Sequence, residues 1–403
     1  MKIIQANKFF FIKGGAERYM FDLSDWLRTH GQEVVPFTMV HERNLPTQYA
    51  SFFPSFVQTS QPKFSLSGIK TVGRMFYSLE ARRKMASLIA AEKPDLCHIH
   101  NIYTQLSPSI LHTLTDQKVP VVMTVHDHHL ISPQYNLWAD ECGTNYQHAG
   151  IVNGTLSRFH KNSYAASFAQ MAAYKFHKLL DIYRKGIASF IVPSSYMKNQ
   201  LIQAGFAREK IRVIPYGIDV NTVQPRFDND GYMLFVGRLS EEKGVEMVLR
   251  LARMIPDIQF KIVGRGPDEA RLHAIGHSLK NVEFVGFKLG EELKELFRGA
   301  KAVLLPSRVH EVFPLTALEA MAAGKPVIGS HVGGMSEMIE DRANGFLVQP
   351  TDLHAWVEAV MRLSYDDALC KRMSKAARLT IEDRFTARKH FTEVMRVYDY
   401  IVN

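Results

Sequence analysis

Short apolar runs separated by amphipathic stretches fill the first half of the chain. The runs at 2–7, 33–39, 96–100, 121–127, 189–194 and 211–216 each have the length and composition of a buried strand. Between the first two, residues 15–30 carry apolar side chains at helical spacing, and Gly31 provides a stop signal. Strands alternating with helices predict a parallel, doubly wound α/β sheet.

The same alternation starts again after a polar, turn-rich segment at 220–231, which predicts a linker. Further strands are expected at 232–236, 258–263, 282–287, 302–306, 327–330 and 346–348. Helices are expected at 245–255, 268–279, 291–300 and 315–323, and the stretch from about 366 to 403 is helical with no strand after it. Two Rossmann-like domains follow, spanning 1–225 and 226–378, with ligands expected beyond the carboxyl ends of their strands.

Composition agrees with a two-domain globular protein. The 403 residues are 46% hydrophobic and 22% charged, which excludes a disordered, collagen-like or disulfide-framework chain. The three cysteines, Cys97, Cys142 and Cys370, form no Cys-x-x-Cys pair and fit a reducing compartment. No signal-peptide core or transmembrane run is evident, so we expect a cytoplasmic protein, in one reading at the inner face of the cytoplasmic membrane.

The excess positive charge is confined to the first half. Residues 1–225 carry 24 Lys and Arg against 15 Asp and Glu, whereas residues 226–403 carry 25 of each. An anionic partner of the first half would explain this asymmetry, for example a membrane surface, a lipid phosphate or a nucleic acid. A basic domain without such a partner is the alternative.

Residues 307–328 are the most informative segment. They predict a helix that begins near Leu315, with Pro314 ahead of it and Gly324 and Pro326 at its end. The amino end of a helix favours an anion such as phosphate. Glu319, about four residues or roughly 6 Å into the helix, suits a ribose diol, and Glu311 suits the hydroxyls of a sugar. For Glu319 taken alone, a solvated position on an amphipathic helix is the alternative.

The whole segment resembles the Glu-x7-Glu signature of the retaining GT-B glycosyltransferases, the family-four or "glycosyl transferases group 1" type. Glu311 and Glu319 have the required spacing, Phe313 and Pro314 lie between them, and Glu-Ala-Met-Ala-Ala-Gly-Lys-Pro-Val-Ile follows. The resemblance implies two Rossmann-like domains facing each other across a cleft. It also implies a closing helix at 379–403 that returns toward the N-terminal domain.

Other segments resemble the same family in order along the chain. Residues 235–244 resemble the loop that supplies Arg238 and Lys243 to the donor pyrophosphate. Residues 263–267 and 285–287 resemble turns that border the nucleobase. The implied donor-binding residues are Gly15, Arg238, Lys243, Gly264, Arg265, Phe287, Glu311, Phe313, Pro314, Leu315, Thr316 and Glu319.

In the first half, residues 13–18 resemble the family's glycine loop, although Gly-x-Gly-x-x-Gly is absent. Residues 123–127 match the family's strand-end histidine, so His126 joins Glu311, Arg238 and Lys243 as a candidate catalytic residue. A structural role for His126 is one alternative. A metal cluster with His100, His128 and His129 is another. Residues 131–157 depart from the family's pattern, so the resemblance assigns no acceptor site.

Net retention of configuration is what the resemblance implies, and no nucleophilic carboxylate is evident for a double displacement. We expect a same-face substitution in which the leaving phosphate accepts the proton of the acceptor hydroxyl. Arg238, Lys243, the Gly15 amide and the helix end near Thr316 would stabilise that phosphate. No metal or other cofactor is expected, and the Asp228-Asn-Asp230 sequence is interpreted as a turn.

Two basic stretches, 63–84 and 157–185, interleave cations with Phe, Tyr, Leu and Met. This composition is typical of a helix lying on an anionic bilayer, and equally of a solvated helix face. Our hypothesis is therefore a lipid-linked acceptor, such as a polyprenyl-diphosphate-linked sugar of a surface polysaccharide, with a UDP- or GDP-sugar as donor and no nucleic acid.

Two competing classes keep the fold. A sugar-nucleotide epimerase or a phosphorylase would not need the Glu-x7-Glu segment, and a non-catalytic nucleotide-sugar or nucleic-acid binding module would not need the donor-side residues. Release of nucleoside diphosphate from a panel of donors separates these interpretations.

Overall fold

The computed structural model describes residues 1–57, 72–137 and 148–403. The chain divides into two compact units. Unit 1 comprises Met1–Pro193, Lys198–Ile214 and Glu393–Asn403, and unit 2 comprises Ser194–Met197 and Pro215–Thr392. Each unit holds one six-stranded parallel sheet, which confirms the expected α/β fold class.

The boundary between the units lies earlier than the predicted 225/226. Residues Pro215–Thr392 belong to unit 2, and hydrogen bonds hold the first part of this range there. The Arg378 guanidinium donates hydrogen bonds to the carbonyls of Val220 and Val223, and the Arg226 amide donates to Ala323. The segment predicted as a linker is thus anchored by an arginine from the far end of the chain.

Unit 1 has the strand order β2-β1-β3-β4-β5-β6. All of its pairings are parallel, so the carboxyl ends of its strands share one edge. The strands are β1 (Lys2–Ala6), β2 (Glu33–Phe37), β3 (Leu96–Ile99), β4 (Val121–Thr124), β5 (Ser189–Val192) and β6 (Ile211–Val213).

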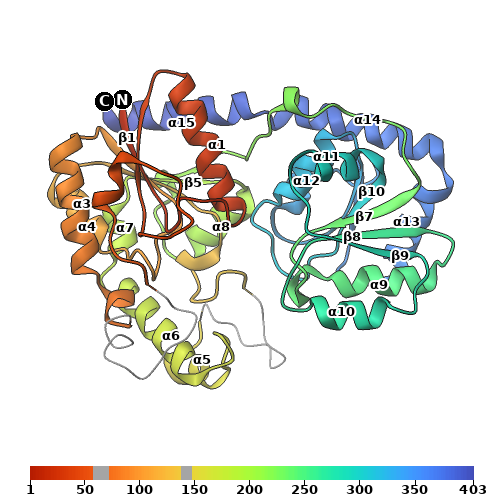
Figure 1. Ribbon diagram of the computed structural model, residues 1–403, viewed down its shortest axis with the longest axis horizontal. Coiled ribbons are helices and arrows are strands. Elements are labelled where there is room, and N and C mark those ends of the chain that lie inside the picture. Colours follow the sequence, from red (N-terminus) through yellow and green to blue (C-terminus); the bar gives the residue numbers. More distant parts are fainter. Residues whose placement is uncertain (58–71, 138–147) are drawn as a thin grey trace. The chain divides into compact units, whose positions relative to one another are not determined.

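Helices cover both faces of this sheet, with α1 on one side and α3 and α4 on the other (Figure 1). Helix α1 ends as the sequence predicts, because Gly31 takes a φ of +76° that favours glycine. The helices of unit 1 are α1 (Gly15–Thr29), α3 (Leu79–Glu92), α4 (Ile110–Asp116), α5 (Ile151–Leu156), α6 (Tyr164–Leu179), α7 (Ile182–Gly186) and the greater part of α8 (Ser195–Gln203).

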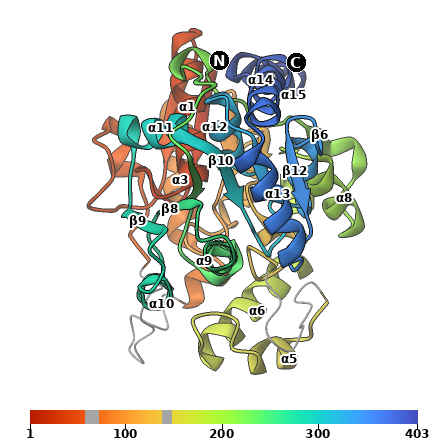
Figure 2. The ribbon, with the colours of Figure 1, turned by 90° about the vertical axis from the view of Figure 1, so that its right-hand side faces the viewer.

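Unit 2 repeats the design with the order β12-β11-β10-β7-β8-β9, again all parallel. Helices α11 and α12 lie on one face of its sheet and α9 and α10 on the other (Figure 2). Its strands are β7 (Tyr232–Val236), β8 (Gln259–Val263), β9 (Val282–Gly286), β10 (Ala300–Leu305), β11 (Val327–Ser330) and β12 (Gly345–Val348). Its helices are α9 (Val245–Met254), α10 (Glu269–Gly276), α11 (Gly290–Gly299), α12 (Leu315–Ala322), α13 (Leu353–Tyr365), α14 (Asp367–Arg384) and the first part of α15 (Ala387–Val402).

Every second residue of the unit 2 strands points into one core. Met233 and Phe235 of β7 pack there with Phe260 of β8, against Val248 of α9 and Trp356 of α13. The residues in between point to the opposite face of the sheet, which helices also cover. Both sets of side chains are therefore buried, and each strand is a continuous apolar run in the sequence. Within the described ranges, no helix is both long and apolar enough to cross a bilayer.

The end of helix α15 belongs to unit 1, where Tyr398 is buried against β3. Its hydroxyl hydrogen-bonds Nδ1 of His98, and Nε2 of His98 hydrogen-bonds the Thr124 hydroxyl. The last residues of the chain are therefore part of the first Rossmann-like unit.

One lysine of unit 2 is fully buried. Lys325 follows α12, is 1% exposed, and donates from Nζ to the carbonyl oxygen of Asp228 at 2.6 Å. Burial, together with the nearby charge of Arg226, lowers the pKa of Lys325 to about 8. Its folded-state pKa thus lies below the ordinary value of about 10.4 that it regains on unfolding.

This burial predicts a pH dependence of stability. Between the folded pKa near 8 and the unfolded value of about 10.4, the unfolded chain binds more protons than the folded chain. The free energy of unfolding should therefore rise with pH across that window, at most by about 1.4 kcal/mol per pH unit. Urea unfolding of the wild type and of Lys325→Met at several pH values measures the difference. An unchanged pH profile in the variant would contradict the assignment.

Candidate functional site

The strand order of unit 2 fixes where a ligand can bind. The chain runs from β7 outward through β8 and β9 and then returns to place β10 on the other side of β7. Connections diverge at this β10/β7 switch point, and open α/β sheets bind ligands there, beyond the carboxyl ends of the strands. Arg238 follows β7 and Glu311 follows β10. Both therefore leave the sheet at its binding edge.

Glu311 is the best-fixed side chain of this edge. Its Oε1 accepts a hydrogen bond from Lys243 Nζ at 2.6 Å and another from the Ser307 hydroxyl at 2.6 Å. The carboxylate is half-buried, with 16% of its side chain exposed, and the lysine is 32% exposed. Charge-assisted hydrogen bonds in such a place are stronger than those at an open surface. The structure thus brings together two of the four candidate catalytic residues.

Two glycines support the backbone on either side of that carboxylate. The Gly334 amide donates to the Glu311 carbonyl at 2.7 Å. Gly333 has a φ of +56°, and a Cβ there would lie 2.2 Å from the same carbonyl oxygen. A Cβ on Gly334 would lie 2.2 Å from the Val312 carbonyl oxygen. Only glycine permits this approach, so the pair fixes the loop that carries Glu311.

The loops after β7 and β8 are joined in a similar way. The Leu239 amide donates to the Arg265 carbonyl at 3.0 Å, and a Cβ on Gly264 would lie 1.8 Å from the Gly237 carbonyl oxygen. Side chains of Arg238 and Arg265 are exposed on these joined loops. Gly244 then brings the start of α9 against the end of β10, since its Cβ would lie 1.9 Å from the Pro306 carbonyl oxygen. The loop after β7, which carries Arg238 and Lys243, is therefore in backbone contact with the segment that leads to Glu311.

Helix α12 begins and ends as the sequence predicts. No side chain caps its amino end at Pro314, and its first turn holds no acidic residue. At the other end Gly324 has a φ of +76°, and the Lys325 amide donates to Ala320 in a Schellman arrangement. Arg378 donates to the Ala322 carbonyl at 2.7 Å, which places a cation at the negative helix end. The amino end is left as an electropositive group.

Leu315, Thr316 and Glu319 form one face of α12. All three are half-buried, whereas Ala317, Leu318 and Ala320 are buried. Glu319 lies four residues after Leu315 and three after Thr316, spacings at which side chains are neighbours on a helix, so Glu319 shares its face with the first turn. A carboxylate and free amide groups are thus presented together.

The remaining predicted donor residues are placed less uniformly. Phe287 directly follows β9 and its side chain is 53% exposed. Phe313 is buried, with its ring edge-on to Tyr216 and Phe385 at centroid distances of 5.8 and 5.6 Å. The ring of Phe313 is therefore part of the core, and only its backbone lies on the Glu311 loop.

The Asp-Asn-Asp sequence forms an ion-paired turn. Arg226 contacts Asp228, and its NH2 group lies 2.7 Å from Asp230 Oδ1. Hydrogen bonding to Arg226 lowers the pKa of Asp230. Across the described part of the chain, no three His, Cys, Asp or Glu side chains converge as metal ligands, and the cluster of four histidines does not form.

In unit 1, β1 and β3 flank the corresponding switch point. Gly15 begins α1, and its exposed amino end receives no side-chain cap from Gly14. Glu17 in the first turn is buried and accepts from the Asn7 side chain at 3.3 Å. The glycine loop is thus held by a polar contact to the strand before it.

His126 is linked to a chain of polar side chains across three strands. Its Nε2 lies 2.9 Å from His100 Nδ1, and His100 Nε2 lies 2.7 Å from Gln5 Oε1. Burial, with the charges of His98 and His126, lowers the pKa of His100 well below its ordinary value. Because the Gln5 oxygen only accepts, neutral His100 donates from Nε2 and accepts at Nδ1. His126 therefore donates from Nε2, which defines its orientation.

Sequence reasoning overlooked two partners in these sites. Ser307 precedes Glu311 by four residues in a loop and offered no periodic signal. Gln5 does carry a sequence signal, because it is a polar residue inside the apolar run of β1. In the structure it is 2% exposed. A buried amide in a strand must find a partner, which here is the histidine chain.

Two family models match the chain. Glycosyltransferase Family 4 matches residues 13–222, and Glycosyl transferases group 1 matches residues 220–380. A curated relative, the glycogen synthase of Mycobacterium tuberculosis, is 30% identical over 322 residues, or 76% of this chain and 69% of that protein. The chain belongs to the group 1 glycosyltransferases. It is therefore an enzyme of the hexosyltransferase type, and the resemblance noted from the Glu311 segment is confirmed at the family level.

A second curated relative and a solved structure extend this comparison. The amylovoran biosynthesis glycosyltransferase AmsK of Erwinia amylovora is 28% identical over 273 residues, covering 64% of this chain and 63% of that protein. The solved structure of HepE from Anabaena in complex with UDP has a TM-score of 0.71 at 19% identity, covering 99% of this chain and 100% of that one. HepE has also been solved with UDP-glucose. At this identity the likeness shows the GT-B fold.

The Gly333 contact gives a prediction for the glycosyltransferase. Gly333→Ala should displace the Glu311 loop and cost about 1–3 kcal/mol of stability through overpacking, beyond a backbone cost of about 1–2 kcal/mol at positive φ. Gly231→Ala is the matched control, because Gly231 has a φ of +85° and no described atom within 4 Å of its Cβ position. Thermal unfolding with and without UDP measures both effects. Equal losses in the two variants would show that the contact is unimportant.

Proposed function

We propose that this glycosyltransferase moves a hexosyl group from a nucleoside diphosphate donor to an acceptor hydroxyl with retention of configuration. The observation that carries the proposal is the Lys243–Glu311 pair at the β10/β7 switch point. An ammonium group has three N–H donors, so Lys243 can hold Glu311 and a phosphate oxygen together. The UDP and UDP-glucose complexes of HepE support a nucleotide-sugar donor for this fold.

The donor would be held by three groups of unit 2. The uncapped amino end of α12, at Leu315 and Thr316, takes the diphosphate. Glu319 on the same helix face accepts hydrogen bonds from the ribose hydroxyls, and Glu311 accepts them from the sugar. Arg238 and Lys243 supply the positive charge. Gly264, Arg265 and Phe287, at the ends of β8 and β9, border the base.

In the proposed reaction, the bond between the anomeric carbon and the phosphate oxygen breaks first, and the electron pair stays on the phosphate. The acceptor oxygen then bonds to the same face of the sugar and transfers its proton to the leaving phosphate. The protein stabilises the charge that develops on the phosphate. Two cations and a helix end balance that charge without a metal ion. Gly15 and His126 stay predicted contributors from unit 1.

Substitutions on α12 and the cationic loop test the donor site. Glu319→Gln should raise the donor KM about tenfold or more, since a hydrogen bond to a charged group contributes about 1.5–3 kcal/mol. Lys243→Met should lower kcat about 10²–10³-fold. Glu358→Gln, an exposed position on α13, should change neither. Release of UDP or GDP from a panel of nucleotide-sugars is the measurement, with and without a chelator.

Each result has a clear meaning. Loss of activity with the chelator would contradict metal-independent transfer. A Glu319→Gln variant that matches the wild type would remove Glu319 from the donor site. An inverted product, seen by NMR of the anomeric proton, would contradict retention.

We further propose a lipid-linked acceptor of the surface-polysaccharide type. The name of the relative AmsK, an amylovoran biosynthesis glycosyltransferase, supports this proposal. The first basic stretch does not carry this proposal. Arg74 is buried beside Glu80, Arg82 lies 2.9 Å from Asp116, and Lys84 donates to the Ser51 carbonyl. Lys63 and Lys70 lie outside the described residues. Three of the four cations that the structure places in this stretch thus serve contacts within unit 1, and the fourth, Arg83, is exposed.

The second stretch does carry it. Tyr164, Phe168, Lys175 and Leu179 of α6 follow one another at helical spacing and lie on one face. Phe168 is 53% exposed and Leu179 is 82% exposed, so this face presents apolar groups to solvent. Exposed apolar groups beside lysines are typical of a helix at an anionic membrane surface.

Vesicle co-sedimentation tests the membrane contact. The wild type should bind vesicles containing phosphatidylglycerol at low salt, and high salt should weaken binding because it screens the lysines. The double substitution Phe168→Ser and Leu179→Ser should reduce binding severalfold. Leu379→Ser, at an exposed position on α14, is the control. An absence of binding to anionic vesicles at low salt would end this proposal.

A further inference from the structure

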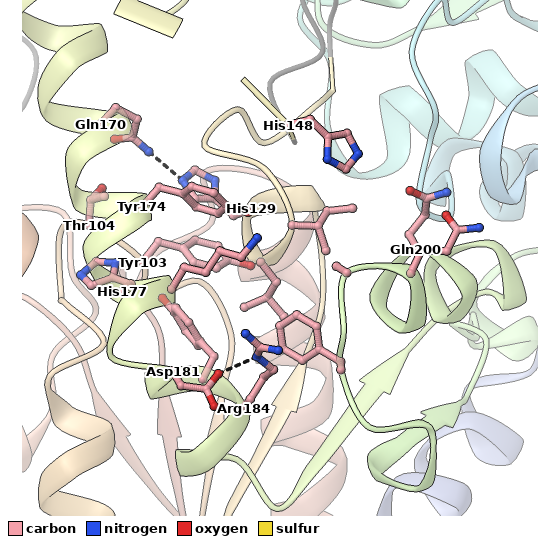
Figure 3. A pocket seen from close by; sticks show the side chains of 17 residues that line it. Tyr103, Thr104, His129, His148, Gln170, Tyr174, His177, Asp181, Arg184 and Gln200 are labelled. Carbon is pink, nitrogen blue, oxygen red and sulfur yellow. Dashed lines mark hydrogen bonds and ion pairs between the residues drawn. The ribbon is translucent and has the colours of Figure 1, made fainter. Parts of the chain in front are cut away.

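Unit 1 contains a pocket that the donor site does not use. It has a volume of about 190 Å³ and lies beyond the carboxyl ends of β3 and β4, between α6, α7 and α8. Figure 3 shows Gln170 and Tyr174 on one side of it and Gln200 on another. All of its lining residues belong to unit 1.

The floor of this pocket is a stack of flat side chains. The rings of Tyr103 and His129 lie 4.3 Å apart at 19°. Gln170 fixes the stack, since its Nε2 lies 3.0 Å from His129 Nε2 (Figure 3). An amide nitrogen only donates, so His129 accepts at Nε2 and is neutral. Burial, with the charges of Lys8 and His177, lowers the pKa of His129 to about 3.

The lining of the pocket includes Tyr183, which carries a hydroxyl group. The Tyr183 oxygen is buried, and it has no hydrogen-bond partner among the described residues. Burial raises the pKa of the Tyr183 hydroxyl well above its ordinary value, and the nearby Asp127 carboxylate raises it further. A buried hydroxyl without a partner costs free energy, and a bound polar group would remove that cost.

The charged groups of the pocket nearly balance. Arg184 lies 2.5 Å from Asp181, which leaves Lys178 as the other cation of the lining. Uncharged polar groups come from Gln200 and Gln203 of α8. A diphosphate would need more positive charge than this lining offers. An uncharged ligand with many hydroxyl groups matches it.

We propose that this pocket binds one uncharged pyranose ring of the acceptor glycan. The ring would lie with its C–H face against the Tyr103 and His129 side chains, where apolar area is buried. Its hydroxyls would bind the Tyr183 oxygen and the α8 carboxamides. Drug-sized ligands occupy roughly 300–1,000 Å³, so the smaller volume limits the occupant to about one ring. This inference rests on the proposed transfer to a glycan and names the part of the acceptor that unit 1 recognises.

Saturation-transfer NMR tests the assignment with defined probes. Methyl α-glucoside, α-mannoside, α-galactoside and N-acetylglucosaminide are each added to the full-length protein, with methyl α-glucuronide as the anionic comparison. At least one neutral glycoside should give transfer to its ring protons. Tyr183→Phe should weaken that signal severalfold, because it removes the hydroxyl and keeps the ring. Ala204→Met, which fills the pocket from the position just after α8, should abolish it.

Matched controls separate this proposal from others. Gln203→Leu removes an exposed lining carboxamide and should weaken the signal, whereas Gln117→Leu, an exposed position after α4, should not. UDP-induced thermal stabilisation should be the same in all variants, because the donor residues lie in unit 2. A preference for the glucuronide, or a signal unchanged in Ala204→Met, would overturn the assignment.

The test stands apart from the proposed transfer reaction. The wild type could bind a neutral glycoside and release no nucleoside diphosphate from any donor. That result would support the pocket assignment and contradict the proposed transfer reaction. Protein that hydrolyses a donor but binds no neutral glycoside would keep the donor site and remove the pocket.

Discussion

The backbone contact between Glu311 and Gly333–Gly334 is the constraint on which the proposed donor site of unit 2 depends. It holds a carbonyl and an amide 2.7 Å apart in a place where any Cβ would collide. With that loop fixed, Ser307 and Lys243 reach the same carboxylate oxygen. A flexible loop would let the carboxylate turn to solvent, and the lysine would lose its position. Preorganisation here is a property of two residues without side chains.

Positive charge serves two purposes in unit 2. Arg378 and Lys325 are buried and donate to backbone carbonyls, where they complete the ends of helices and turns. Arg238 and Arg265 are exposed on loops beyond the strands. The equal numbers of acidic and basic residues in this half therefore say little about its ligand.

The sequence predicts the sheets well because their strands are buried on both faces and read as apolar runs. All twelve strands lie where the periodicity places them, and Gly31 and Gly324 end their helices as expected. The spacing of Glu311 and Glu319 likewise located one face of the site. Pairings of long sequence separation were beyond such reasoning. The hydrogen bonds of Gln5 with His100 and of Arg378 with three carbonyls depend on which segments become neighbours, and periodicity carries no information about that.

The β4 connection links the predicted catalytic histidine of unit 1 to the proposed acceptor pocket. His126 precedes Asp127, whose side chain accepts from the His129 amide at 2.9 Å and so begins a 3₁₀ turn. Only two residues, Asp127 and His128, therefore separate His126 from His129 in the floor of the pocket. The carboxylate that joins them is half-buried, and desolvation raises its pKa. A shift of the ring-binding floor would move this turn, and with it the hydrogen bond between His126 and His100. A ring bound in the proposed pocket would therefore act on the orientation of His126 through these four consecutive residues.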